Sequence, residues 1–165
     1  MSSKQPDSNC SSGTITLALI KPQAILRGYV PGILEMIKEK GFNVLATRQL
    51  TLSEEQAAVF YEEHANNYYF EPLVEYMTSG PVMAVLLQRS QAVPTFRLLI
   101  GATDPAEAAE GTIRKKYGTT TRYNAIHGSD SDQRARWEAE FFFAPLERYL
   151  LPLDAPTAAS HKTTL

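Results

Sequence analysis

The heptapeptide TITLALI at residues 14–20 runs directly into Lys21 and Pro22, and the fold can be worked out from it. It is short, apolar and partly β-branched, a composition typical of a strand that is buried in a core. The strand ends abruptly at the Lys-Pro pair. A core strand therefore delivers a lysine side chain, that of Lys21, to its end.

Signals for helices and strands alternate along the rest of the chain. Apolar residues at helical spacing before Gly41 predict a helix of about ten residues, and Ser53 with Gln56 forms a possible capping box for a helix that runs to residue 64. Ser90 can cap a further helix that reaches about residue 100. The other expected elements are helices at 69–79 and 131–143, strands at 42–52 and 82–87, and a long loop at 101–118 with one or two helical turns. A short strand is expected just before the last helix.

This order of elements fits an α+β sandwich, and we expect its helices to cover one face of a mainly antiparallel sheet. Residues 14–153 are expected to form one domain, since the polar segments 1–13 and 154–165 are typical of disordered tails. No stretch approaches the ~18 apolar residues that would suggest a membrane-spanning helix.

The composition is that of an ordinary soluble globular protein, with 44% hydrophobic and 21% charged residues among 165 and a formal net charge of -2. Such a charge supplies no overall positive field for nucleic acid or an anionic membrane, so any polyanion must be held locally. The single cysteine, Cys10, excludes an intramolecular disulfide and a zinc site built from cysteines. We therefore expect a cytoplasmic protein with neither membrane nor nucleic acid as a partner.

The run NAIHGSDS at residues 124–131 places the imidazole of His127 among small and polar residues, where a ligand could reach it. A histidine can act as a nucleophile that carries a transferred group through a covalent intermediate. Taken alone, a histidine in a loop is more often a surface or structural residue. We interpret His64 and His161 in that way.

Cationic side chains are the candidates for holding phosphate, because the chain has neither a GxxxxGK[ST] nor a GxGxxG motif. Lys21, Arg97 and Arg114 lie at the ends of elements or in the irregular segment, where an arginine fork or a lysine point charge suits phosphate oxygens. Thr103 and Asn124 add neutral hydrogen-bonding capacity. Each of these residues taken singly is more often a solvated surface group.

Four segments together resemble the nucleoside diphosphate kinase family in sequence, order and spacing. They are LALIKPQA (17–24), EYMTSGPV (75–82), IGATDPAEAAEGTIRKKYG (100–118) and NAIHGSDS (124–131), and HGSDS with GTIR is a highly specific pair. The resemblance implies a ferredoxin-like α+β sandwich whose four-stranded antiparallel sheet is covered by helices. It also implies Mg²⁺-nucleotide substrates, ping-pong transfer of a γ-phosphoryl group from a nucleoside triphosphate to a diphosphate through phosphohistidine, and homo-oligomers of four or six subunits.

Carried over residue by residue, the resemblance makes His127 the nucleophile and Glu138 the carboxylate that holds the other imidazole nitrogen. Tyr61 would lie beside the histidine. Tyr69, where the family usually has phenylalanine, would stack on the base, with Leu73 packing nearby. Contacts to phosphates or ribose would come from Lys21, Arg97, Thr103, Arg114 and Asn124. No metal ligand from the protein is implied, because Mg²⁺ would be bound mainly through the nucleotide phosphates.

The chain departs from the family pattern in four places. The segment after Phe143 has no match in the family pattern, which leaves subunit contacts and oligomer number open, and the other three departures leave another interpretation of the function open. Gln23 replaces the aspartate usual after Lys-Pro, Tyr123 stands where an arginine commonly precedes the asparagine, and Asn67 occupies a position that is often basic. They motivate the alternative of a nucleotide-binding regulatory protein with the same fold and little turnover. A third hypothesis, nucleic-acid binding through the basic cluster at 114–116, has only Tyr117 as an aromatic platform.

Overall fold

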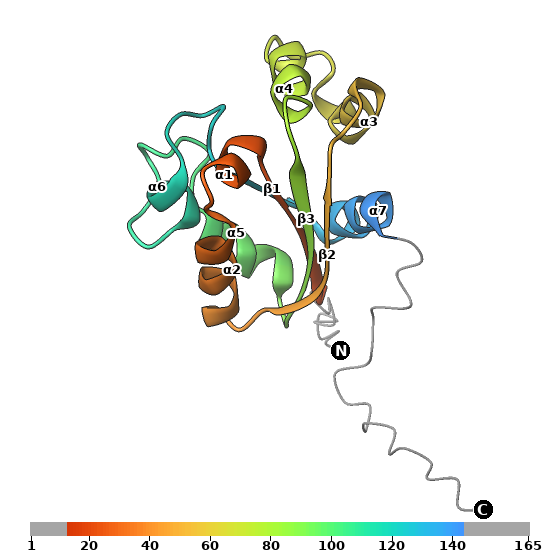
Figure 1. Ribbon diagram of the computed structural model, residues 1–165. Coiled ribbons are helices and arrows are strands. Elements are labelled where there is room, and N and C mark those ends of the chain that lie inside the picture. The colour runs from red at the N-terminus through yellow and green to blue at the C-terminus, as the bar shows by residue number, and fades with distance from the viewer. Residues whose placement is uncertain (1–12, 144–165) are drawn as a thin grey trace, which may run out of the picture.

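The computed structural model describes residues 13–143, which form a four-stranded sheet with helices packed on it (Figure 1). The strands are β1 (Ile15–Ile20), β2 (Asn43–Leu50), β3 (Val82–Gln88) and β4 (Ile126–Gly128), in the spatial order β2-β3-β1-β4. Every neighbouring pair is antiparallel. The expected α+β sandwich with a four-stranded antiparallel sheet is confirmed.

Strand β1 lies in the interior of the sheet, between β3 and β4, and all six of its residues are buried. Successive side chains of a strand point to opposite faces of the sheet. Leu17 and Leu19 accordingly belong to one apolar cluster, and Ala18 and Ile20 belong to a second. Leu19 also pairs with His127 of β4, so the core strand places that histidine two positions from Lys21 in the register.

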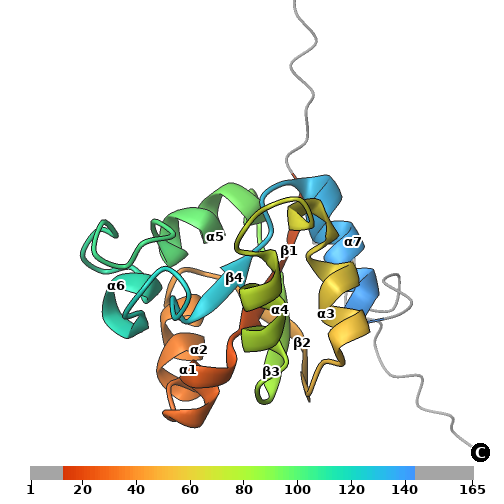
Figure 2. The same ribbon diagram turned by 90° about the horizontal axis from the view of Figure 1, so that it is seen from above.

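Helices cover both faces of the sheet, as the view from above shows (Figure 2). One layer contains α1 (Pro22–Leu26), α2 (Val30–Glu39), α5 (Ala92–Ile100) and α6 (Ile113–Tyr117). The other contains α3 (Glu54–Phe60), α4 (Phe70–Met77) and α7 (Asp132–Phe142), with the 3-10 turn η1 (Glu62–His64) after α3. The expectation that helices cover one face was therefore wrong, because β1 and β3 are apolar on both sides.

Some helix ends follow local sequence signals and others do not, and the helix expected to run to residue 64 ends at Phe60. The expected capping box at Ser53 is present, and the hydroxyl of Ser131 caps α7. The expectation that Ser90 caps α5 was wrong. The N-cap of this helix is Gln91, in a left-handed conformation with φ 50° and without a side-chain cap, and the next N–H, that of Ala92, donates to a backbone carbonyl in the segment before β1.

Parts of the expected domain organisation lie outside the described residues. These parts are the N-terminal tail up to residue 12, the end of the domain at 144–153 and the C-terminal tail at 154–165. Across residues 13–143, none of the helices has the length and apolar character needed to cross a membrane.

Candidate active site

A cavity of about 650 Å³ opens where β1 ends and β4 begins, and the residues singled out from the sequence converge on it. Those that line it are Lys21, Tyr61, Tyr69, Leu73, Arg97, Thr103, Arg114, Asn124 and His127. Glu138 lies behind the histidine and is fully buried. The fold thus brings together side chains that are spread over most of the sequence.

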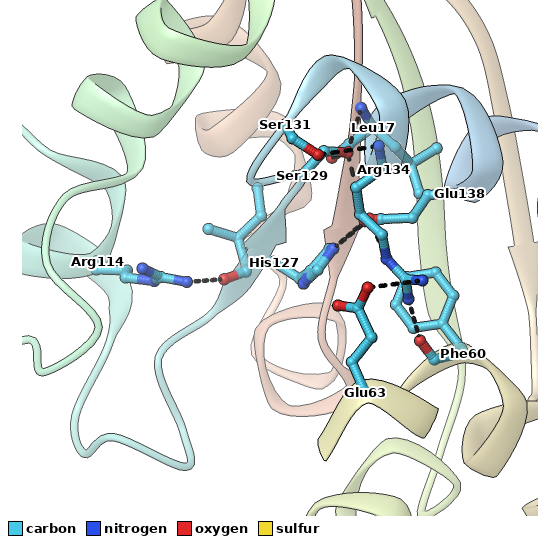
Figure 3. Close-up of polar contacts among 10 residues, drawn as sticks. Leu17, Phe60, Glu63, Arg114, His127, Ser129, Ser131, Arg134 and Glu138 are labelled. Atoms are coloured by element: carbon cyan, nitrogen blue, oxygen red, sulfur yellow. Dashed lines mark hydrogen bonds and ion pairs between the residues drawn. The ribbon is translucent and has the colours of Figure 1, made fainter. Parts of the chain in front are cut away.

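His127 presents one imidazole nitrogen to the protein and the other to the cavity. Its Nε2 contacts both carboxylate oxygens of Glu138, with Oε2 at 3.1 Å (Figure 3). The hydroxyl of Ser129 donates to Oε1 of the same carboxylate at 3.3 Å. A hydrogen bond to a carboxylate places the proton on Nε2. Within residues 13–143 no hydrogen-bond partner faces Nδ1, so this nitrogen keeps its lone pair for a ligand.

Lys21 carries an amino group that is buried although it has no acidic partner in the described part of the chain. The residue is 6% exposed, and its Nζ donates to Oδ1 of Asn124 at 2.6 Å. Its backbone N–H bonds to the carbonyl of Ala125, which fixes the end of β1 against the strand that carries His127. Burial, and then the charge of Arg114, lower the pKa of Lys21 to about 7.

Arg114 and Arg97 complete a cluster of cations around the same cavity. The guanidinium of Arg114 donates at 3.0 Å to two backbone carbonyls, those of Gly101 and Ile126, while its buried Nε has no partner among residues 13–143. Burial, and then Arg97, lower the pKa of Arg114 to about 10. Such mutual repulsion favours a bound anion, since phosphate oxygens would stabilise all of these charges together.

Tyr61 stands beside His127, with 6.0 Å between the two ring centroids. The residue is buried, and its hydroxyl has no hydrogen-bond partner within the described residues. Burial, and then the charge of Glu138, raise the pKa of the Tyr61 phenol, so the group stays protonated and can donate. An unpaired buried donor at the wall of a cavity is best satisfied by an oxygen of a bound ligand.

Tyr69 and Leu73 lie at the side of the cavity formed by α4. The ring of Tyr69 is 39% exposed, so an aromatic ligand could reach it. Its hydroxyl is held by its neighbours: it bonds to Nδ1 of His64 at 2.8 Å and accepts a hydrogen bond from Nδ2 of Asn67 at 3.0 Å. The interpretation of His64 as a structural or surface residue has to be widened, because His64 also lines the cavity.

Comparison with known proteins identifies the family that has this fold. The family model described as nucleoside diphosphate kinase matches residues 14–148. The chain belongs to the nucleoside diphosphate kinase family. It is 46% identical over 134 residues to the nucleoside diphosphate kinase of Flavobacterium psychrophilum, and the match covers 81% of this chain and 96% of that protein. It is equally identical over 132 residues to the nucleoside diphosphate kinase of Pasteurella multocida, across 80% of this chain and 95% of that protein.

Solved structures agree with this assignment. The crystal structure of the Aquifex aeolicus nucleoside diphosphate kinase has a TM-score of 0.79 and 39% identity, and the match covers 81% of this chain and 97% of that chain. The nucleoside diphosphate kinase structure from Encephalitozoon cuniculi also has a TM-score of 0.79, at 34% identity, covering 81% of this chain and 91% of that chain. The described part of the chain therefore has the fold of these nucleoside diphosphate kinases.

Three of the four departures from the family pattern fall within residues 13–143, and they lie away from the histidine. Gln23 and Tyr123 both meet Tyr76: the backbone N–H of Gln23 donates to the Tyr76 hydroxyl at 3.2 Å, and the ring of Tyr123 packs perpendicular to it at 4.8 Å. Asn67 contacts the Tyr69 hydroxyl instead. None of these side chains bonds to His127 or to its carboxylate. The departures thus leave His127 and the groups that bond to it unchanged.

Sequence reasoning missed several residues of the site. Glu63, Arg122, Asp130 and Arg134 also line the cavity, and Ser129 supports the buried carboxylate. The helical spacing of Arg134 and Glu138, four residues apart, was a usable signal, because such residues are neighbours on one helix face. No sequence pattern pointed to Glu63, since its contact with the last helix is made across the fold.

Proposed function

We propose that the chain transfers the γ-phosphoryl group of a nucleoside triphosphate to a nucleoside diphosphate through a phosphohistidine at His127. Family membership establishes the activity class, that of a phosphotransferase acting on nucleotides. The assignment of His127 as the nucleophile rests on one observation. Nε2 of His127 is bound to Glu138, which leaves Nδ1 directed at a cavity surrounded by cations.

In the first half reaction, the Nδ1 lone pair of His127 attacks the γ-phosphorus. The Nδ1–P bond forms as the bond from phosphorus to the bridging β-phosphate oxygen breaks, and the nucleoside diphosphate leaves with that electron pair. In the second half reaction, a terminal β-phosphate oxygen of another diphosphate attacks the same phosphorus and releases the imidazole. The reaction is therefore ping-pong, with one site serving both nucleotides.

The cations would hold phosphate oxygens in line with the nucleophile and offset the charge that is spread over the transferring group. Lys21 and Arg114 are buried and pre-positioned by hydrogen bonds, while Arg97 reaches the cavity from α5. Glu138 would keep the proton on Nε2 and offset the positive charge that develops on the ring as Nδ1 is phosphorylated. The phenol of Tyr61 would donate to an oxygen of the transferring group.

The base and sugar would be held less specifically. Tyr69 would stack on the base with Leu73 beside it, and Thr103 and Asn124 would contact ribose or phosphate. Stacking leaves the hydrogen-bonding edge of the base unread, so we expect broad specificity among nucleotides.

The residues present fit a Mg²⁺ ion that arrives with the nucleotide. Within the described residues there is no group of three or more His, Cys, Asp or Glu side chains that could hold a metal ion. Mg²⁺ is usually bound by one or two carboxylates together with substrate phosphates. Asp130 is an exposed carboxylate of the cavity wall that could contribute in this way. When bound, the ion supplies charge neutralisation at the phosphate oxygens.

Two further properties belong to this proposal. We expect a homo-oligomer of four or six subunits, supported by the family relationship, and a cytoplasmic location, supported by the composition and the single cysteine. The alternative of a regulatory protein with little turnover is favoured by none of the contacts, because the departures that motivated it lie away from His127.

The experiment is direct. The protein is incubated with γ-labelled ATP and Mg²⁺, and we expect a labelled protein whose phosphoryl bond is labile to acid and stable to alkali. His127→Ala should abolish labelling, whereas the matched variant His64→Ala should retain it. Normal labelling of the His127→Ala protein would contradict the assignment of the nucleophile.

A further inference from the structure

Arg134 contacts both carboxylates and aromatic rings close to His127. It lies on α7, four residues before Glu138, and its side chain is only 15% exposed. Its Nε lies 3.8 Å from Oε2 of Glu138, and Nη1 lies 3.7 Å from Oε1 of Glu63 (Figure 3). Its Nη2 donates to the backbone carbonyl of Phe60. One guanidinium therefore connects the buried carboxylate to the segment that follows α3.

Stacking limits the freedom of this guanidinium further. Its central carbon lies 4.0 Å from the centroid of the Trp137 ring, in the range where a cation and an aromatic face attract each other. Trp137 itself is stacked on Phe141, so it is a firm platform. The planar fork of an arginine can satisfy such contacts simultaneously, which a lysine cannot.

The carboxylate of Glu138 is shared among three cationic or proton-donating groups. It is fully buried, and its Oε1 contacts Nε2 of His127 and accepts from Ser129, while Oε2 faces Arg134. A buried carboxylate is held in one orientation only when its lone pairs are satisfied. Without Arg134, Oε2 would lose its positive neighbour and the carboxyl group could rotate or shift away from the imidazole.

We propose that Arg134 is a positioning residue for phosphoryl transfer: it fixes Glu138, and through Glu138 it keeps the proton of His127 on Nε2 and Nδ1 free to attack. The inference rests on the proposed role of His127 as the nucleophile. Arg134 also ties α7 to Phe60 and Glu63, which lie next to Tyr61, so the two sides of the cavity that flank the imidazole are joined by one side chain.

The first test measures the tautomer of the His127 imidazole by ¹⁵N NMR and does not depend on turnover. The chain has three histidines, so ¹⁵N-labelled histidine gives a small set of ring signals, and His127→Ala identifies those of His127. In the unmodified protein we expect Nε2 protonated and Nδ1 unprotonated. In Arg134→Gln the two ¹⁵N signals of His127 should move toward each other, because both tautomers become populated. Arg134→Lys keeps a positive charge beside Glu138 and should recover most of the separation.

The second test separates positioning from substrate binding. Arg134→Gln should lower kcat roughly 10- to 100-fold, since a small displacement of a reacting group has effects of this size. The KM for nucleoside diphosphate should change less than about twofold, because an interaction needed only in the transition state does not alter ground-state binding. Arg136→Gln is the matched control: it removes an exposed arginine from the same helix, outside the cavity, and should leave both constants unchanged.

The outcomes are distinguishable from one another. A raised KM with an unchanged kcat would mean that Arg134 binds phosphate directly, and it would overturn the inference. Arg134→Gln could instead leave the His127 tautomer and the kcat per folded molecule unchanged and lower only the unfolding temperature. That result would show that Arg134 has a structural role alone, and it would overturn the inference. If the unmodified protein formed no phosphohistidine, the proposed function would fail. If it formed phosphohistidine and Arg134→Gln had the same tautomer and kcat, only this inference would be refuted.

Discussion

Substitution of Lys21 by methionine should stabilise the fold while abolishing phosphoryl transfer. Methionine has a similar length and no charge, and the site of Lys21 is almost entirely buried. Burial and Arg114 lower the pKa of Lys21 from 10.5 to about 7, which corresponds to roughly 4 to 5 kcal/mol against the charged form at 1.36 kcal/mol for each pKa unit. A phosphate bound beside Lys21 would offset its charge and reduce this free energy.

The free energy of unfolding of Lys21→Met will rise by less than this value of roughly 4 to 5 kcal/mol. Losing Lys21 removes its hydrogen bond to Asn124 and leaves a buried amide oxygen unpaired, at a cost of about 1 to 3 kcal/mol. We therefore expect Lys21→Met to raise the free energy of unfolding at pH 7 by about 1 to 3 kcal/mol, which corresponds to a rise of several degrees in Tm.

The pH dependence supplies the sharper readout. Because the pKa of Lys21 is lower in the folded state, the unfolded chain binds more protons between about pH 7 and pH 10.5. The stability of the unmodified protein relative to the variant should therefore rise with pH across that window. Urea unfolding of both proteins at matched pH measures this difference. A variant that is less stable at pH 7, or a stability difference that does not change between pH 7 and pH 10, would refute the reasoning.

Two other substitutions probe the site. Glu138→Gln keeps the shape of the buried side chain but removes its charge. Hydrogen bonds to charged groups are stronger than neutral ones by roughly 1 to 2 kcal/mol, so steady-state kinetics should give a kcat lowered by about 5- to 30-fold. An unchanged kcat would contradict the role of the carboxylate. Tyr69→Phe removes the hydroxyl that bonds to His64 and Asn67 but keeps the aromatic face, so the KM for nucleoside diphosphates should rise no more than about fivefold with kcat unchanged. A large fall in kcat for Tyr69→Phe would show that the hydroxyl acts in the chemical step.

The fold could be predicted in outline because its central strand has a strong local signal. The uninterrupted apolar run of β1, the capping box at Ser53 and the cap at Ser131 are all encoded within a few residues. The start of α5 was mistaken because it depends on a long-range bond from Ala92 to the segment before β1. The sequence analysis also missed that helices cover both faces of the sheet. The order of helices and strands along the chain does not say which helix packs on which face.

The site could be predicted where residues stand in recognisable motifs or match the family pattern residue by residue. His127, Lys21 and Arg114 lie in segments whose local sequence marks them, and the cavity contains all three. Glu63 is different, because its contact with Arg134 joins residues that are 71 positions apart in the chain and belong to no shared motif. The lowered pKa of Lys21 was equally out of reach, since it arises from burial and from a charge on a distant helix.

The central claim is that Nδ1 of His127 carries the phosphoryl group. The most direct measurement is ³¹P and ¹⁵N NMR of the histidine-labelled protein after reaction with ATP and Mg²⁺. The contact between Nε2 and Glu138 predicts phosphorus coupled to Nδ1 of His127, with the proton retained on Nε2. Phosphorus on Nε2, or on any residue other than His127, would contradict the account.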